Sequence, residues 1–155
     1  MFEPGRFFTC EGWVHAAILV ADQPVWTALD RLKDHLAGLF GAPWPLRGRS
    51  GLITRTLVIH GGEVRDDLEV RPAGSKGHVR AFAGDEPLDG AAIVMAGAFL
   101  FDDRVILGPG TVVEPGALIK GPTVVGAGSD VRQGAYVRGD CLVGDGCVVG
   151  HTTEV

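Results

Sequence analysis

Two basic side chains and one histidine are the residues of the C-terminal third whose types favour binding or catalysis. Lys120 follows Asp102, and Arg138 follows Lys120, by the same interval of three six-residue repeats. A guanidinium offers a planar fork to the oxygens of a phosphate group. His151 is the single histidine of this part, and histidine is the commonest general acid or base. The pattern indicates a site for an anionic ligand at Arg138 and Lys120, with His151 as the candidate for proton transfer. The alternative is that all three are exposed surface residues.

A period of six residues places these side chains. From Phe101 onward every sixth residue is apolar, and from the second hexad a small residue follows four places after each apolar one. A fixed short period is stronger evidence than any single motif. The apolar positions are Phe101, Leu107, Val113, Ile119, Val125, Val131, Val137, Val143, Val149 and Val155. The small positions are Thr111, Ala117, Thr123, Ser129, Ala135, Cys141, Cys147 and Thr153.

Three hexads make one coil, and glycines recur at the interval of a coil, which is typical of tight bends. Short strands of successive coils then stack at about 4.8 Å, so that equivalent residues of successive coils form columns on the surface. A column of glycines suits an oligomer contact or a ligand groove, and equally the tight turns of any solenoid. The expected columns are Asp102, Lys120 and Arg138; Gly108, Gly126 and Gly144; and Glu114, Arg132 and Gly150.

The N-terminal part, residues 1–48, is expected to be an arm followed by an amphipathic helix over about residues 23–40. Apolar residues recur there with helical spacing. Asp22 is expected to cap the helix, Pro24 to lie in its first turn, and Gly41 to end it. The stripe consists of Val25, Leu29, Leu32, Leu36 and Leu39.

Residues 49–94 are expected to form an irregular β segment. It follows a linker over 43–51 and begins with a strand over 52–59. A six-residue spacing of Leu52, Val58, Val64 and Val70 suggests a first coil, and residues 72–90 suggest an inserted hairpin with a strand over 78–83. The repeat then occupies 95–155.

Composition argues against several classes of protein, namely nucleic-acid-binding, membrane and metal-binding proteins. The net charge of −5 gives no reason to expect nucleic acid as a partner. No apolar run reaches the roughly 18–20 residues that span a bilayer, so we expect a cytoplasmic protein without a membrane partner. The cysteines Cys10, Cys141 and Cys147 have no metal-ligand spacing, and we expect small packing roles for the last two and no metal.

Residues 107–153 resemble the left-handed parallel β-helix of hexapeptide-repeat transferases. Residues 121–155, GPTVVGAGSDVRQGAYVRGDCLVGDGCVVGHTTEV, resemble the C-terminal acetyltransferase-type domain of bacterial sugar-1-phosphate nucleotidylyltransferases. That group includes the N-acetylglucosamine-1-phosphate uridyltransferase/glucosamine-1-phosphate acetyltransferase. The resemblance implies a mainly β fold in which this helix follows an N-terminal amphipathic helix and an irregular β segment.

The resemblance also implies roles. An arginine within the AYVRG-type stretch binds the sugar phosphate in the family, and Arg138 occupies that position; Lys120 would widen the anionic site. The family's catalytic histidine, tyrosine and asparagine lie beyond the GHTTEV stretch, residues 150–155. We therefore expect a truncated or split member, or one whose β-helix a separate chain completes.

Two functions follow as expectations. The first is acetyl transfer from acetyl-CoA to a sugar phosphate or nucleotide sugar, in UDP-N-acetylglucosamine biosynthesis, by a homotrimer. The alternative is a non-catalytic trimerisation or regulatory module associated with a nucleotidylyltransferase, whose own catalytic domain has no counterpart here. A metalloenzyme resembling γ-carbonic anhydrase would need several histidines on neighbouring coils, and only His151 lies in the repeat.

Overall fold

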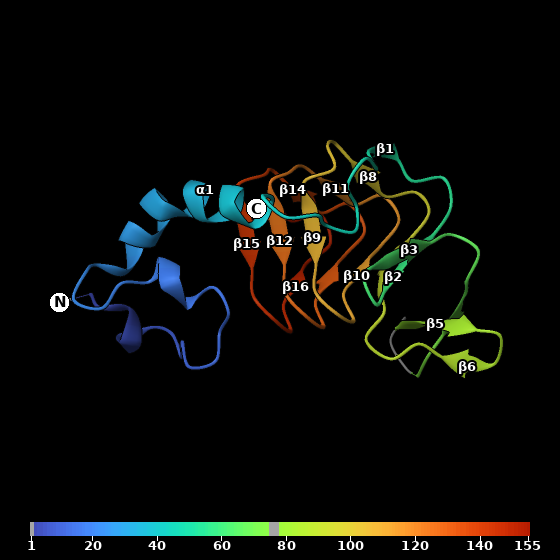
Figure 1. The fold of residues 1–155 in the computed structure, drawn as a ribbon, viewed down its shortest axis with the longest axis horizontal. Helices are drawn as coiled ribbons and strands as arrows, with labels where there is room; N and C mark the ends of the chain where they lie inside the picture. The colour runs from blue at the N-terminus through green and yellow to red at the C-terminus, as the bar shows by residue number, and fades with distance from the viewer. Residues whose placement is uncertain (1, 75–77) are drawn as a thin grey trace. The chain divides into compact units, whose positions relative to one another are not determined.

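The computed structural model of this protein describes residues 2–74 and 78–155. Two compact units, Met1–Gly41 and Ala42–Val155, make up the chain. The first is helical and the second is built mainly of β-strands (Figure 1). Among the described residues, no helix combines the length and apolar character needed to cross a membrane.

The helix expected over residues 23–40 is present but shorter. Helix α1 (Ala28–Leu39) has 12 residues, and the turn before it is a 3-10 helix over Val25–Thr27. Asp22 does not cap α1, because the N-cap residue is Thr27 and Asp22 itself has a φ of 63°. Two further 3-10 helices precede α1, at Pro4–Arg6 and Ala16–Ile18.

The packing of α1 uses only part of its apolar stripe. Leu36 is fully buried, whereas Leu29 keeps 69% of its surface exposed. The rings of His15 and His35 connect the segment before Ala16–Ile18 to α1, with Nδ1 of the first 3.0 Å from Nε2 of the second.

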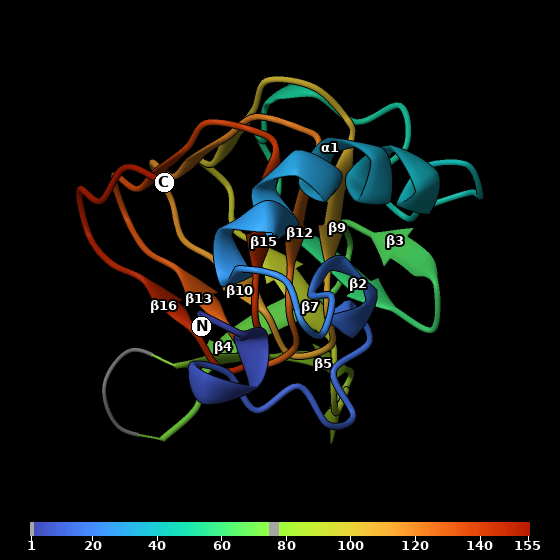
Figure 2. The same cartoon turned by 90° about the vertical axis from the view of Figure 1, so that its left-hand side faces the viewer.

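The second unit contains a parallel β-solenoid of about three coils, whose strands form three sheets (Figure 2). Each coil contributes one short strand to each sheet. In the first sheet the order is β1 (Gly51–Leu52), β8 (Phe99–Leu100), β11 (Leu118–Ile119) and β14 (Tyr136–Val137). In the second it is β16 (Val148–Val149), β13 (Asp130–Val131), β10 (Val112–Val113), β7 (Ala92–Val94), β2 (Leu57–His60) and β3 (Glu63–Arg65). In the third it is β15 (Cys141–Val143), β12 (Thr123–Val125) and β9 (Val105–Leu107).

The coils stack in parallel at a constant interval along the sequence. Val112 pairs with Asp130, and Asp130 with Val148, so the register is the one that the expected columns require. Half of the ten expected interior positions are almost unexposed. Those that are less than 2% exposed are Val113, Ile119, Val125, Val131 and Val137. Val149 is 5% exposed, Leu107 and Val143 are partly buried against the core, and Val155 is 46% exposed.

The small polar residues of the interior stabilise the bends. Thr111, Thr123 and Ser129 are fully buried. Each hydroxyl donates a hydrogen bond to a backbone carbonyl at a corner: Thr111 to Gly126 at 2.6 Å, Thr123 to Lys120 at 2.6 Å, and Ser129 to Gly144 at 2.9 Å. A short hydroxyl side chain therefore satisfies a carbonyl that the tight turn removes from the strand ladder.

The first coil departs from this constant interval. Leu100 pairs with Ile119 and Phe99 with Leu118, so these partners are one residue further apart in the sequence than the partners in the later coils. Leu100 is fully buried, whereas Phe101 is 52% exposed. The expectation that Phe101 points inward is wrong, because the first coil holds one more residue than the coils that follow it.

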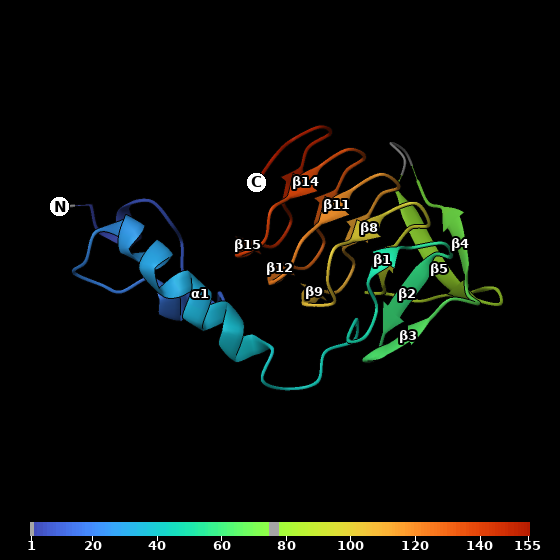
Figure 3. The same ribbon diagram turned by 90° about the horizontal axis from the view of Figure 1, so that it is seen from above.

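Residues 49–94 do not begin with a coil. Strand β2 pairs antiparallel with β7 and with β3, and β1 pairs antiparallel with β8. The six-residue spacing from Leu52 to Val70 therefore has no counterpart in the solenoid. The inserted hairpin is present as an antiparallel sheet of β4 (Glu69–Pro72), β5 (Val79–Ala83) and β6 (Glu86–Pro87) (Figures 1 and 3).

The segment expected to be a linker instead covers one end of the core. Leu46 is 1% exposed and belongs to the solenoid's apolar cluster, together with Ile53, Leu57 and Ile59. Trp44 packs against the same cluster. This end of the solenoid is thus covered by residues that precede the repeat.

Candidate functional site

The strands β8, β11 and β14 lie side by side and end at the same corner of the solenoid (Figure 3). The residues that follow them are Phe101, Lys120 and Arg138. The amide of Phe101 donates to the carbonyl of Ile119, and that of Lys120 to the carbonyl of Val137, both at 2.9 Å. The structure therefore brings Lys120 and Arg138 together on adjacent coils, about one strand spacing of 4.8 Å apart at the backbone.

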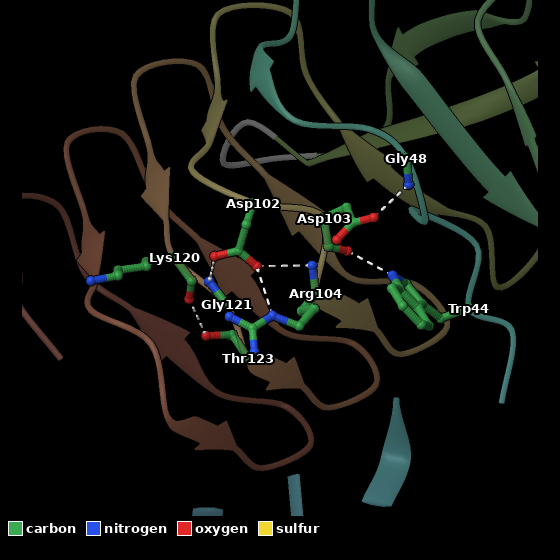
Figure 4. Close-up of polar contacts among 8 residues, drawn as sticks. All are labelled: Trp44, Gly48, Asp102, Asp103, Arg104, Lys120, Gly121 and Thr123. Atoms are coloured by element: carbon green, nitrogen blue, oxygen red, sulfur yellow. Dashed lines mark hydrogen bonds and ion pairs between the residues drawn. The ribbon is translucent and has the colours of Figure 1, made fainter. Parts of the chain in front are cut away.

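Asp102 does not continue this column as expected. The extra residue of its coil places Phe101 over Lys120 and turns Asp102 inward, half-buried. Its carboxylate accepts hydrogen bonds from the amides of Arg104, at 3.0 Å, and Gly121, at 3.1 Å (Figure 4). Asp102 thus binds backbone on two coils, and the exposed column is Phe101, Lys120 and Arg138.

Gly121 allows the close approach of these two corners. A Cβ atom there would lie 2.5 Å from the Arg104 carbonyl oxygen and 2.9 Å from the Arg104 Cβ. The Thr123 hydroxyl, from the other side, donates to the Lys120 carbonyl at 2.6 Å. The backbone on both sides of the Lys120 side chain is therefore held, while the side chain itself is exposed.

Asp103 ties the same corner to the segment before the solenoid. Its carbonyl accepts from the Trp44 indole at 2.7 Å, and its carboxylate accepts from the Gly48 amide at 2.7 Å (Figure 4). Sequence reasoning missed these contacts. The sequence signal that could have predicted these contacts is the pair of adjacent acids, Asp102 and Asp103. They lie in the coil that is one residue longer than those that follow it.

The charges of the corner are partly paired. Arg138 lies 3.2 Å from Glu154, and both side chains are about two-thirds exposed. Such an exposed pair contributes only about 0–1 kcal/mol, so that an anionic ligand can compete with Glu154. Lys120 forms no ion pair with any residue that the structure describes. The corner therefore presents the exposed cations Lys120 and Arg138 and the Glu154 carboxylate, beside the ion pair of Arg104 and Asp102 at 3.4 Å.

His151 lies at a different corner. It follows β16, and its neighbour Thr152 donates from its amide to the carbonyl of Gln133 at 3.4 Å, which places His151 next to Gln133 rather than beside Arg138. His151 is exposed. Within one chain the structure separates the candidate base from the two candidate ligand-binding residues.

The expected column of glycines is a close backbone contact. A Cβ on Gly108 would lie 2.5 Å from the Ala127 amide, and one on Gly126 would lie 2.5 Å from the Gly144 carbonyl carbon. Glycine is required at these corners by the neighbouring coil. Of the two interpretations of this column, the tight turn of the solenoid accounts for it.

The two cysteines of the repeat differ in environment. Cys141 is half-buried and donates to the Gly139 carbonyl at 3.1 Å; burial raises the pKa of its thiol. Cys147 is exposed. All three cysteines are free, and among the described residues no three His, Cys, Asp or Glu side chains are grouped to hold a metal ion.

No protein-family model, no curated protein and no solved structure matches this chain.

Proposed function

We propose that this protein is a member of the left-handed hexapeptide-repeat transferases that binds a phosphate-bearing sugar at the corner of Lys120 and Arg138. The observation that carries the proposal is the pairing of these two exposed cations on adjacent coils. A phosphate dianion accepts charge-assisted hydrogen bonds from both an ammonium and a guanidinium. The constant interval between paired strands of the solenoid agrees with three hexads in each coil.

The reaction that fits this proposal is acetyl transfer from acetyl-CoA, in the cytoplasm, within a homotrimer. An amine or hydroxyl of the sugar attacks the thioester carbonyl, the CoA thiolate leaves, and a base takes the acceptor's proton. Lys120 and Arg138 would bind and orient the acceptor. His151 follows a strand of a different sheet from the one that precedes Arg138, so another copy of this chain, or another chain, would supply the base.

Calorimetric titration with glucosamine 1-phosphate tests the binding step. We expect Arg138→Gln to weaken binding about tenfold or more, because a hydrogen bond to a charged group contributes about 1.5–3 kcal/mol. Arg132→Gln is the matched control, since Arg132 is an exposed arginine of the same coil that follows β13 instead of β14. Equal affinity of the Arg138 variant and the parent would refute the assignment.

A second function has its own observation. The strand register aligns apolar side chains on the outer face of the first sheet, those of Leu52, Phe99, Leu118 and Tyr136. Leu52 is 59% exposed and Leu118 37%, and Phe101, which follows β8, is 52% exposed. The ring of Phe101 also contacts those of Phe99 and Tyr136, at centroid distances of 5.1 and 6.3 Å. Contiguous exposed apolar surface is typical of protein interfaces, which favours the non-catalytic trimerisation or regulatory module associated with a nucleotidylyltransferase.

Acetyl-CoA separates the two functions. The transferase should release heat on titration with acetyl-CoA and form acetylated sugar phosphate, which mass spectrometry detects. The module should do neither, yet should be trimeric by light scattering and become monomeric on Leu118→Glu. A protein that binds acetyl-CoA and is monomeric would contradict the module.

A further inference from the structure

A hollow of about 250 Å³ lies at the covered end of the solenoid, and neither Lys120 nor Arg138 lines it. Its polar lining comes from the segment before β1 and from the bend between β1 and β2. The side chains that matter are those of Arg49, Ser50, Thr54, Arg55 and Asp66.

Backbone hydrogen bonds fix both walls of the hollow. The Arg49 amide donates to the Leu46 carbonyl at 2.9 Å, next to Gly48, whose amide is held by Asp103. On the other side the Ile53 amide donates to Ala98 at 2.9 Å, and the Thr56 hydroxyl accepts from the Ala96 amide at 3.1 Å. Thr54 and Arg55 lie between these anchors, are exposed, and belong to the connection between β1 and β2 that lines the hollow.

The hollow gathers donors that have no partner within the described part of the protein. The Arg49 guanidinium and the hydroxyls of Ser50 and Thr54 make no hydrogen bond or ion pair with any described residue. An arginine fork and two hydroxyls offer N–H and O–H donors from three directions. Unused donors around a concavity are the complement of an acceptor-rich ligand.

The net charge of the lining is positive. Arg55 lies 3.3 Å from Asp66, which anchors the guanidinium to the turn after β3 and neutralises one charge. Arg49 supplies a second cation that no described carboxylate neutralises. The balance of two arginines against one aspartate leaves one positive charge, which suits an anion and disfavours a cation.

Size narrows the ligand class. Pockets for drug-sized ligands occupy about 300–1,000 Å³, and this hollow is smaller. Leu52, Ile53 and Leu57 complete its lining; Ile53 and Leu57 are buried, whereas Leu52 is 59% exposed. A compact, acceptor-rich anion fits these dimensions better than a whole nucleotide.

We propose that this hollow is an anion site that binds a phosphoryl group, held by Arg49 and Arg55 with the hydroxyls of Ser50 and Thr54. The phosphoryl group belongs either to inorganic phosphate or to a small phosphate monoester. The site is separate from the corner of Lys120 and Arg138 and does not depend on the transferase proposal.

Titration calorimetry of the full chain with inorganic phosphate, and separately with glycerol 1-phosphate, tests the site at low ionic strength. We expect Arg49→Gln and Arg55→Gln each to weaken binding about tenfold. Asp66→Asn should strengthen it, because the variant removes the negative charge from the lining. Tighter binding of glycerol 1-phosphate than of inorganic phosphate would identify an ester as the ligand, and the reverse order would identify the free ion.

Arg65→Gln is the matched control, since Arg65 is an exposed arginine next to Asp66 that pairs with Asp67 at 2.8 Å outside the hollow. Equal losses for Arg49→Gln and Arg65→Gln would show a response to general surface charge and overturn the proposal. Absence of binding to either probe would also overturn it. The corner of Lys120 and Arg138 is itself proposed to bind phosphate, so each titration is repeated in a chain that carries Arg138→Gln. Arg49→Gln should weaken binding by the same factor in that background, which distinguishes failure of this site from failure of the other. Loss of all phosphate binding on Arg138→Gln alone would overturn the proposal. Circular dichroism of each variant confirms that it is folded.

Discussion

The solenoid and the N-terminal unit differ in how completely they bury their large apolar side chains. In the solenoid, Val113, Val125 and Val131 are fully buried, each between equivalent residues of neighbouring coils. In the N-terminal unit, Leu36 is fully buried, but Phe7 and Trp26 remain more than half exposed. A repeat makes every coil the partner of the next. A single amphipathic helix specifies which face is apolar without specifying what covers it.

The largest effect should come from truncating the core of the solenoid. Ile119→Ala removes a side chain that is fully buried between Leu100 and Val137. We expect a loss of about 2–5 kcal/mol in the free energy of unfolding, measured by urea denaturation. Leu118→Ala, the adjacent residue on the outer face of β11, is the control and should cost less than about 1 kcal/mol.

The same test in the N-terminal unit sharpens the contrast. Leu29→Ala should change stability by about 0.5 kcal/mol or less, because Leu29 is 69% exposed. A loss at Leu29 as large as that at Ile119 would show that a partner surface covers this helix in solution. The N-terminal unit would then bury its apolar side chains in solution as completely as the solenoid does.

An effect smaller than that of Ile119→Ala, but larger than that of Leu29→Ala, is expected where the corners of adjacent coils meet. Gly121→Ala places a methyl group against the Arg104 backbone, 2.5 Å from its carbonyl oxygen. Overpacking of this kind costs about 1–3 kcal/mol. The midpoint of urea unfolding should fall accordingly, and an unchanged midpoint would mean that the two corners are not in contact.

A small effect of opposite sign is expected within α1. Gly38 lies in the helix, and a Cβ there would meet no atom within 4 Å. Gly38→Ala should stabilise the helix by about 0.4–1 kcal/mol, because alanine loses less backbone entropy on folding. Hydrogen exchange of the α1 amides should slow about two- to fivefold. Faster exchange would show that Gly38 contacts another surface.

These contrasts also explain what the sequence could predict. The period of Val113, Ile119, Val125, Val131 and Val137 reflects one interaction that repeats, so the parallel stacking could be predicted from it. The exposure of Phe101 could not be predicted, because the regular spacing of apolar residues does not show that the first coil has one additional residue. The structure moves the interior position to Leu100, as the pairing with Ile119 shows.

Residues 44–70 show the limit of local patterns. The segment around Trp44 and Leu46 contains prolines and glycines and reads as a linker, yet Leu46 is buried in the core. Its burial depends on a surface that the following coil creates. The antiparallel direction of β1 and β2 likewise depends on how the chain enters the solenoid, which no spacing of apolar residues records.

The candidate site, like the fold, could be predicted only where the interval between coils is constant. The interval of one coil places Lys120 and Arg138 together, and the structure does so too. The role of Asp102 was not predictable, because its hydrogen bonds to Arg104 and Gly121 follow from the longer first coil. The separation of His151 from Arg138 follows from the three-sided coil, in which these two residues follow strands of different sheets.

The reversed strands at the covered end affect how this protein behaves toward other copies of itself. A stack of parallel strands offers each terminal edge as a template for further strands, which is how cross-β fibres grow. At this end the second sheet terminates in β3, a short antiparallel strand whose Glu63 and Arg65 are exposed. Charges on a short edge strand oppose pairing with another chain. Chain reversal therefore protects this end of the solenoid against polymerisation.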